Sequence, residues 1–187
     1  PPEPAQVRRL AGRRLYHALD LDRWRGRRVV RFHDPDVALD LGGIAKGFGV
    51  DRAVAALRDW GMLHALVNVG GDLYALGDSP EGDPWRVGIR SLEDARQLAG
   101  TFEVSNQAVA TSGDYQQYFE YGGRRYHHLI DPGTAAPRVS AVHSVTIVAD
   151  SCLHADAAAT ATFGMRPDGA AALLRACAAG ARLVRPG

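Results

Sequence analysis

A carboxylate, two glycines and a lysine occur together in residues 40–47, which read DLGGIAKG. The stretch places Asp40 before the glycine turn and Lys46 in the first turn of an expected helix. Glycines let the backbone approach a ligand closely, and a helix N-terminus offers free N–H groups to an anion. Lys46 could therefore bind a phosphate, and Gly43 could expose a carbonyl oxygen to a cation. A tight turn with a solvated lysine explains the same residues, and neither the Walker loop nor the dinucleotide fingerprint is present.

A second carboxylate precedes a hydroxyl by four residues in the alanine-rich stretch 154–162. On a helix, Asp156 and Thr160 share one face, which the alanines leave closely approachable. A carboxylate and a hydroxyl are hard oxygen donors of the kind that Mg²⁺ prefers, with substrate phosphates as further ligands. A helical aspartate beside a threonine that hydrogen-bonds to its own helix is the alternative interpretation.

Two adjacent histidines, His127 and His128, precede the sequence Leu-Ile-Asp-Pro-Gly. On a strand they would point to opposite faces, so at most one of them faces a site. A neutral imidazole could take a proton from an attacking hydroxyl near neutral pH. An ordinary surface or core histidine is the alternative, and the Asp-Pro-Gly segment predicts a turn.

A further stretch of hydroxyl and acidic residues, TSGDY at 111–115, could line a pocket or form a turn. No Gly-x-Ser-x-Gly elbow surrounds Ser112, so a serine hydrolase has little support. Asn68 and Asp72, on either side of a Gly-Gly pair, are open to both a functional and a structural interpretation.

Hydrophobic periodicity and glycine turns predict an α+β fold with mostly antiparallel sheets and packed helices, in a single domain over residues 1–187. Ser151 is expected to cap the second helix, and Asp168 the third. The expected strands are 28–32, 37–41, 64–69, 72–76, 85–89, 101–104, 108–111, 119–121, 125–130, 142–148 and 181–184, and the expected helices are 44–60, 152–163 and 168–179.

The composition excludes several classes of protein. The net charge of +1 gives no basis for nucleic-acid binding, which needs a concentrated basic surface. No apolar run approaches the roughly 18 residues of a transmembrane helix. Cys152 and Cys177 match no metal-binding spacing and are expected to be buried thiols.

Taken in order, five motifs closely resemble those of the ApbE family, the FAD:protein FMN transferases. The resemblance extends over roughly residues 28–185 and implies an α+β fold related to the tunnelling folds, FAD as substrate and Mg²⁺ at its pyrophosphate. The motifs are DLGGIAKGFGVDRA (40–53), VNVGGDL (67–73), TSGDY (111–115), HLIDPGT (128–134) and ADAAATA (155–161).

The resemblance also implies roles for individual residues. Positions matching Asp40, Lys46 and Ile130 contact FAD in the family. Gly43 corresponds to a main-chain oxygen ligand of the metal, and the side-chain metal ligands correspond to Asp156 and Thr160. His128 corresponds to the histidine that is proposed to activate the acceptor hydroxyl.

The implied reaction is phosphoryl transfer: FMN passes from FAD to a threonine (Ser/Thr) hydroxyl of a target flavoprotein, and AMP is released. Two alternatives stay open, namely an FAD pyrophosphatase that gives FMN and AMP, and an FAD-binding module without activity. The family usually works outside the cytoplasm, so a periplasmic or membrane-associated extracytoplasmic location is the expectation that the resemblance supports.

The sequence departs from the family pattern at three points. Ala135 follows Thr134 where the family usually has glycine, and Ala158 replaces a larger apolar residue on the metal-binding helix. By the resemblance, we expect this chain to lack the N-terminal region of the family, which binds the isoalloxazine and adenosine. We therefore expect the cleft around Asp40, Lys46 and Ile130 to be open on one side.

Overall fold

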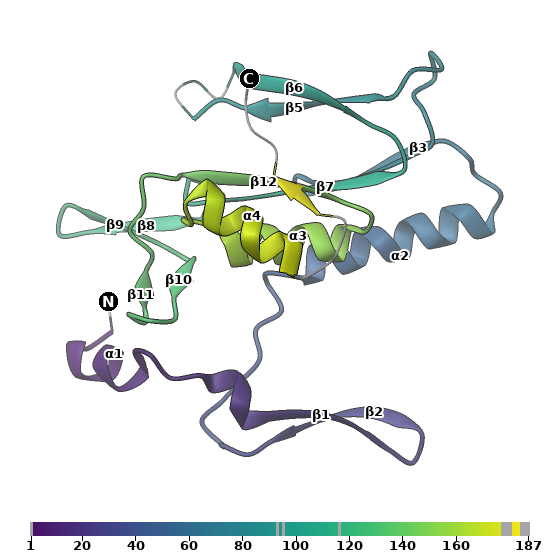
Figure 1. The fold of residues 1–187 in the computed structure, drawn as a ribbon. Helices are drawn as coiled ribbons and strands as arrows, with labels where there is room; N and C mark the ends of the chain where they lie inside the picture. The colour runs from purple at the N-terminus through teal and green to yellow at the C-terminus, as the bar shows by residue number, and fades with distance from the viewer. Residues whose placement is uncertain (1, 93, 95, 116, 177–180, 184–187) are drawn as a thin grey trace. The chain divides into compact units, whose positions relative to one another are not determined.

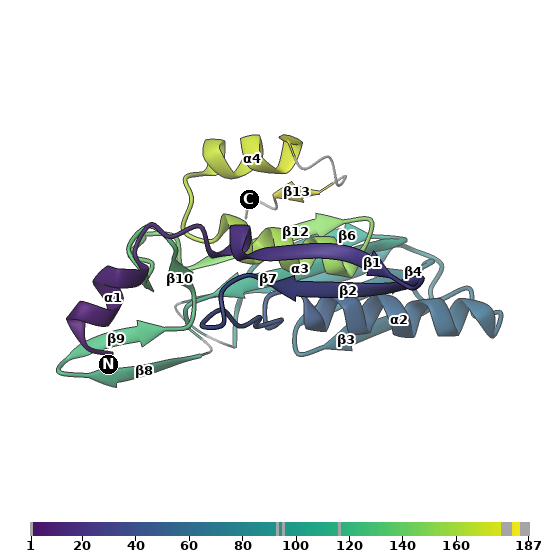
Figure 2. The same ribbon diagram turned by 90° about the horizontal axis from the view of Figure 1, so that it is seen from below.

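The chain folds into two compact units. Their helices and strands are labelled in Figures 1 and 2. The computed structural model describes residues 2–92, 94, 96–115, 117–176 and 181–183. Unit 1 consists of Pro1–Asp40 and Phe119–Arg138, and unit 2 consists of Leu41–Tyr118 and Val139–Gly187. The single domain over 1–187 stays a prediction.

Unit 2 is built on a five-stranded antiparallel sheet, which confirms the expected α+β class. Its strand order is β13-β12-β7-β4-β3, and a tight glycine turn joins β3 to β4. The strands are β3 (Ala65–Val69), β4 (Asp72–Leu76), β7 (Gln107–Gly113), β12 (Ser144–Ala149) and β13 (Arg182–Leu183).

Helices α2 (Ala45–Asp59) and α3 (Cys152–Thr162) cover one face of this sheet and contact each other (Figure 1). Helix α2 lies on β3 and β4, whereas α3 lies on β7 and β12. Small residues make the close approach of α3 possible, since Ala155 and Ala159 are fully buried. A further helix, α4 (Pro167–Ala176), contacts α3 and β13. In the part of the chain that the structure describes, no helix is both long and apolar enough to cross a membrane.

A two-stranded ribbon, β5 (Trp85–Arg90) with β6 (Leu98–Val104), supplies side chains to a hydrophobic core. Because successive side chains of a strand point to opposite faces, Leu73 packs in this core while its neighbour Asp72 points toward the helices. Burying each large apolar side chain contributes about 1.5 to 3 kcal/mol. The core consists of Leu73, Ala75, Val104, Val109 and Val148, against which Trp85, Val87 and Phe102 pack.

Unit 1 consists of short helices and three two-stranded antiparallel ribbons, β1–β2, β8–β9 and β10–β11. The first residue of β8, Tyr118, belongs to unit 2, and the rest of that strand belongs to unit 1. The elements are α1 (Pro4–Leu10), a 3₁₀ turn (Leu15–Ala18), β1 (Leu19–Trp24), β2 (Arg27–Phe32), β8 (Tyr118–Tyr121), β9 (Arg124–His127), β10 (Ile130–Asp131) and β11 (Ala136–Pro137).

Some predicted elements were wrong or incomplete. Residues 37–41 form no strand, because no neighbouring strand pairs with them and both Leu39 and Leu41 are about half exposed. Strand β1 was missed, and the expected strand 125–130 is divided into β9 and β10. Helix α4 begins at Pro167, so Asp168 lies in its first turn and is not its cap. Cys177, the expected helix end at 177–179 and Val184 lie outside the described residues.

Helices α2 and α3 satisfy each other's N-terminal N–H groups. Asp51 of α2 accepts hydrogen bonds from Cys152 N at 2.7 Å and from Leu153 N at 3.0 Å. In return, Gly47 N in the first turn of α2 donates to Asp156 Oδ2 of α3 at 3.0 Å. These groups have no partner within their own helices, so the exchange fixes the position of α2 along α3. Ser151 completes the cap of α3, as predicted, by accepting from the N–H of residue 154.

Replacing Asp51 with alanine is expected to lower the free energy of unfolding by about 2 to 3 kcal/mol, because two N–H groups lose a charged acceptor. Urea unfolding measures this difference. Asp59→Ala, at the exposed C-terminal end of α2, is the control and should change the free energy by less than about 0.5 kcal/mol. Equal losses for both variants would show that Asp51 has no special role as a cap.

Candidate functional site

An ion pair joins the start of α2 to the start of β4. Lys46 Nζ lies 2.7 Å from Asp72 Oδ2. Asp72 is 1% exposed, whereas the lysine side chain is half-buried and reaches the surface. A cation in the first turn of a helix opposes the helix dipole, and α2 has no acidic residue there to balance it. Asp72 provides that balance from outside the helix.

Burial raises the pKa of Asp72 above its usual value, although the hydrogen bond and charge of Lys46 act in the opposite direction. The nearby carboxylate of Asp156 raises this pKa further. Burial, together with these carboxylates, also raises the pKa of Cys152 to about 12. The thiol therefore stays protonated and donates to the Leu73 carbonyl at 3.6 Å, as a buried structural cysteine.

Asp156 lies at the closest approach of α2 and α3. It is 3% exposed, and Gly47 N donates to one of its oxygens. A β-carbon at Gly47 would lie 2.6 Å from the carbonyl carbon of Cys152 and 2.8 Å from Leu153 Cα. Glycine at this position therefore lets the backbones of the two helices approach until the hydrogen bond forms.

Thr160 follows one turn later on α3 and lies beside both the glycine turn and β7. Its Oγ1 is 3.3 Å from Ser112 Oγ, and a β-carbon at Gly43 would lie 3.2 Å from the same oxygen. The structure therefore brings together four of the predicted site residues, all in unit 2: Gly43, Lys46, Asp156 and Thr160. We call these four residues the α2–α3 cluster.

The donors of the α2–α3 cluster fit Mg²⁺ bound together with phosphate. They comprise one carboxylate, one hydroxyl and one backbone carbonyl, all hard oxygens, and Mg²⁺ typically keeps waters and phosphate oxygens as its other ligands. Among the described residues there is no group of three or more His, Cys, Asp or Glu side chains that could hold a metal. Such a group could form an all-protein cage, whereas the α2–α3 cluster contains one residue of these types, Asp156.

Sequence reasoning missed Asp72 and Ser112 as neighbours of this cluster. Their contacts to Lys46 and Thr160 join residues that lie 26 and 48 positions apart. The sequence does contain one sign that Lys46 is a special residue, because it is the only lysine. All other positions with a lysine or arginine hold arginine, so the compact ammonium group occurs at this position alone.

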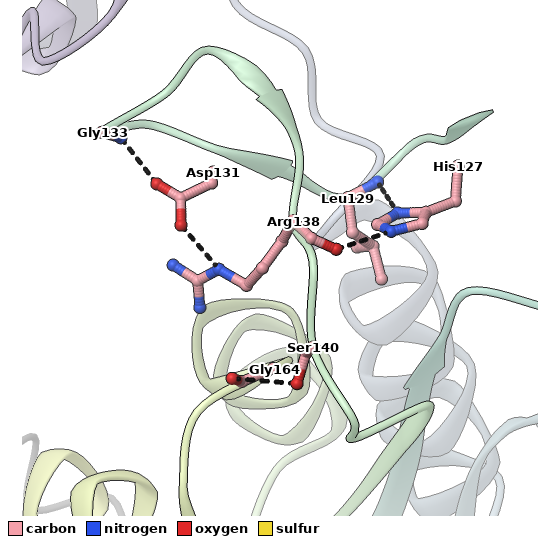
Figure 3. Close-up of polar contacts among 7 residues, drawn as sticks. All are labelled: His127, Leu129, Asp131, Gly133, Arg138, Ser140 and Gly164. Atoms are coloured by element: carbon pink, nitrogen blue, oxygen red, sulfur yellow. Dashed lines mark hydrogen bonds and ion pairs between the residues drawn. The ribbon is translucent and has the colours of Figure 1, made fainter. Parts of the chain in front are cut away.

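In unit 1, His127 and His128 differ in their surroundings. His127 Nδ1 accepts from Leu129 N at 3.2 Å, and its Nε2 lies 2.9 Å from the Arg138 carbonyl oxygen (Figure 3). Only the neutral tautomer with the proton on Nε2 satisfies both contacts. His127 therefore organises the backbone, while the imidazole of His128 is exposed.

The predicted Asp-Pro-Gly turn is confirmed, and Asp131 organises it (Figure 3). Its Oδ1 accepts from Gly133 N at 2.7 Å and its Oδ2 from Arg138 Nε at 3.1 Å. Ala135, at the position where the family resemblance leads us to expect glycine, adopts a φ of 52°. An alanine in this left-handed region is strained by its β-carbon.

We expect Ala135→Gly to raise the free energy of unfolding by about 0.5 to 1 kcal/mol, because relief of the left-handed strain exceeds the entropy that glycine adds to the unfolded chain. Ala136→Gly, at the neighbouring strand residue, should lower it by a similar amount. Thermal or urea unfolding of the two variants checks the prediction, and a destabilising Ala135→Gly would contradict it.

The remaining predicted site residues, Asp40, His128 and Ile130, all belong to unit 1. Each of them is exposed. Their participation in one site with the α2–α3 cluster stays a prediction.

Comparisons with known proteins identify the family of the chain. The sequence model of the ApbE family matches residues 1–183. An FAD:protein FMN transferase of Klebsiella pneumoniae is 37% identical over 147 residues, which cover 78% of this chain and 45% of the relative. One of Vibrio cholerae is 42% identical over 127 residues, covering 67% of this chain and 38% of the relative. The chain thus spans less than half the length of these relatives.

Solved structures give the same result for the fold. The ApbE protein of Thermotoga maritima matches with a TM-score of 0.83 at 32% identity, covering 98% of this chain and 59% of that one. The flavin transferase ApbE of Vibrio cholerae matches with a TM-score of 0.79, also at 32% identity, over 97% of this chain and 57% of the other. On the family match and these shared folds, the chain belongs to the ApbE family.

Proposed function

We propose that this chain provides the FAD-pyrophosphate and metal site of an FAD:protein FMN transferase, which transfers FMN to a Ser/Thr hydroxyl of an acceptor flavoprotein and releases AMP. The observation that carries the proposal is the α2–α3 cluster. It places a lysine, the N-terminus of α2 and hard oxygen donors within one small region of unit 2.

Each member of the cluster has a distinct role in the proposal. Lys46 binds phosphate oxygens of FAD as a compact positive charge, and the N-terminus of α2 adds its dipole. Asp156 and Thr160 hold Mg²⁺ through their side-chain oxygens, and Gly43 through its carbonyl oxygen. When bound, Mg²⁺ neutralises charge on the pyrophosphate and helps to hold it in line for displacement.

The bond changes of the proposed reaction balance without an oxidant or reductant. The acceptor oxygen forms a bond to the FMN-side phosphorus, and the bond from that phosphorus to the AMP oxygen breaks with its electron pair on AMP. The acceptor hydroxyl loses its proton, for which we propose His128 as the base. Its neighbour His127 is less suited to this role, because both of its ring nitrogens contact backbone groups.

The experiment that tests this function combines the protein with FAD, Mg²⁺ and a peptide that carries a Ser/Thr flavinylation motif. Mass spectrometry should show the peptide heavier by one FMN, with AMP released in equal amount, and EDTA should abolish both products. Release of AMP and free FMN without any modified peptide would show FAD hydrolysis instead. Absence of all these products would contradict both activities.

His128→Ala and Lys46→Ala should separate catalysis from binding. Loss of a general base acts on the barrier, so His128→Ala should slow FMN transfer by about 100-fold or more with a small change in FAD affinity. Lys46→Ala should mainly weaken FAD binding, because its charge acts on the bound ground state. Single-turnover rates and FAD titrations measure the two effects, with His154→Ala, an exposed histidine of α3, as the control. Equal losses of affinity in both variants would refute this division of roles.

A further inference from the structure

Asp72 is a buried carboxylate that forms an ion pair with Lys46. It is 1% exposed, at the first position of a strand whose remaining residues are all buried. The Lys46 ammonium lies 2.7 Å from its Oδ2, and a backbone hydrogen bond from Thr111 also reaches the carboxylate, so the ammonium is the charge that offsets its own. Leaving a carboxylate in such a place is unfavourable without a cation beside it.

The Lys46 side chain passes close to the turn before β4. A β-carbon at Gly70, in that turn, would lie 3.8 Å from Lys46 Cδ. The side chain therefore passes Gly70 and ends at Asp72. An unpaired lysine would lose this fixed position, because its four-carbon chain has many rotamers.

We propose that Asp72 is the positioning residue that holds the Lys46 ammonium in place for a phosphate group of FAD. An ammonium has three donor protons, so Lys46 can keep the contact with Asp72 and still donate to a phosphate. Because the lysine side chain is already ordered in the folded protein, FAD binding does not lose the conformational entropy of that side chain. This inference rests on the proposed function, since it concerns how the same site binds FAD.

A purely structural role would predict a different result. A carboxylate that only filled space or balanced the helix dipole would affect stability, and its replacement would leave the mobility of Lys46 in the folded protein unchanged. The sole lysine of the sequence makes this distinction measurable, because ε-¹⁵N-lysine labelling gives a single side-chain ammonium signal, that of Lys46.

The test measures that signal and the FAD affinity, in the presence of Mg²⁺, for the unaltered protein, Asp72→Asn and Asp114→Asn. Asp114 is another buried carboxylate of unit 2, paired with His143 at 2.8 Å, and serves as the matched control. We expect Asp72→Asn to release the Lys46 ammonium into fast motion and to weaken FAD binding by about 10-fold. Asp114→Asn should do neither. In a Lys46→Met background, Asp72→Asn should weaken FAD binding no further.

An Asp72→Asn protein with an unchanged Lys46 signal and unchanged FAD affinity would overturn the inference. A mobile Lys46 ammonium in the unaltered protein before FAD is added would also overturn it, whether or not the variant folds. A Lys46 signal that does not respond to saturating FAD in the unaltered protein would contradict the proposed function itself, and the inference with it. Because that measurement uses only the unaltered protein, failure of the proposed function can be distinguished from failure of the inference about Asp72.

Discussion

Gly47→Ala is expected to lower the free energy of unfolding by about 3 kcal/mol, the upper end of the usual cost of overpacking. The added methyl group would overlap backbone atoms of Cys152 and Leu153, which cannot move aside as a flexible side chain can. Helices α2 and α3 would have to separate, and the hydrogen bond from Gly47 N to Asp156 would lengthen or break. Urea unfolding measures the stability, and FAD titration measures the accompanying loss of binding.

Gly49→Ala is a matched control on the same helix. A β-carbon at Gly49 would meet no heavy atom within 4 Å, and the residue is exposed. Alanine favours a helix over glycine by about 1 kcal/mol, so this variant should be more stable than the unaltered protein. Two variants of the same chemical kind, two positions apart, should therefore change stability in opposite directions. A stabilising or neutral Gly47→Ala would show that α2 and α3 are not as close as the structure has them.

Asp156→Asn is expected to reduce FMN transfer by on the order of 100-fold or more while leaving the fold intact. Asparagine keeps an oxygen that can accept the hydrogen bond from Gly47 N, but it removes the negative charge proposed to hold Mg²⁺. Loss of charge stabilisation by the metal amounts to several kcal/mol of transition-state energy. The measurements are the transfer rate as a function of Mg²⁺ concentration and the free energy of unfolding.

Three further variants make the Asp156 result specific. Asp168→Asn, at an exposed position in the first turn of α4, should transfer FMN at the unaltered rate. Asp156→Ala should lose the same activity and, in addition, about 1 to 2 kcal/mol of stability with its hydrogen bond. Thr160→Val should be less harmful than either Asp156 variant, because water can replace a neutral ligand. A fully active Asp156→Asn protein would remove the carboxylate from the proposed metal site.

The helices that carry the α2–α3 cluster were predictable because their signals are local. The spacing of apolar residues predicted α2, and Ser151 with its hydroxyl marked the start of α3. Placing Asp156 and Thr160 on one face needed only the helical repeat. The closeness of Gly43 to Thr160 depends on the packing of α2 against α3, and only the family resemblance anticipated it.

Strands and long-range contacts were less predictable, because their partners lie elsewhere in the chain. Residues 37–41 form a mostly apolar run like that of a strand, yet no strand among the described residues pairs with them, and the pairing of β1 with β2 was missed. Asp72 resembled an ordinary residue after a glycine turn until its contact with Lys46 appeared. Burial and ion pairing are properties of the folded chain, which explains why the sequence left Asp72 open.

We propose that the α2–α3 cluster holds a divalent cation together with the pyrophosphate of FAD. Anomalous diffraction from crystals grown with FAD and with Mn²⁺ in place of Mg²⁺ locates the cation. We expect one manganese peak that contacts Asp156, Thr160 and the Gly43 carbonyl oxygen, with a phosphate of FAD beside Lys46. FAD bound with its phosphates away from Lys46, or a manganese peak that does not touch Asp156, would contradict it.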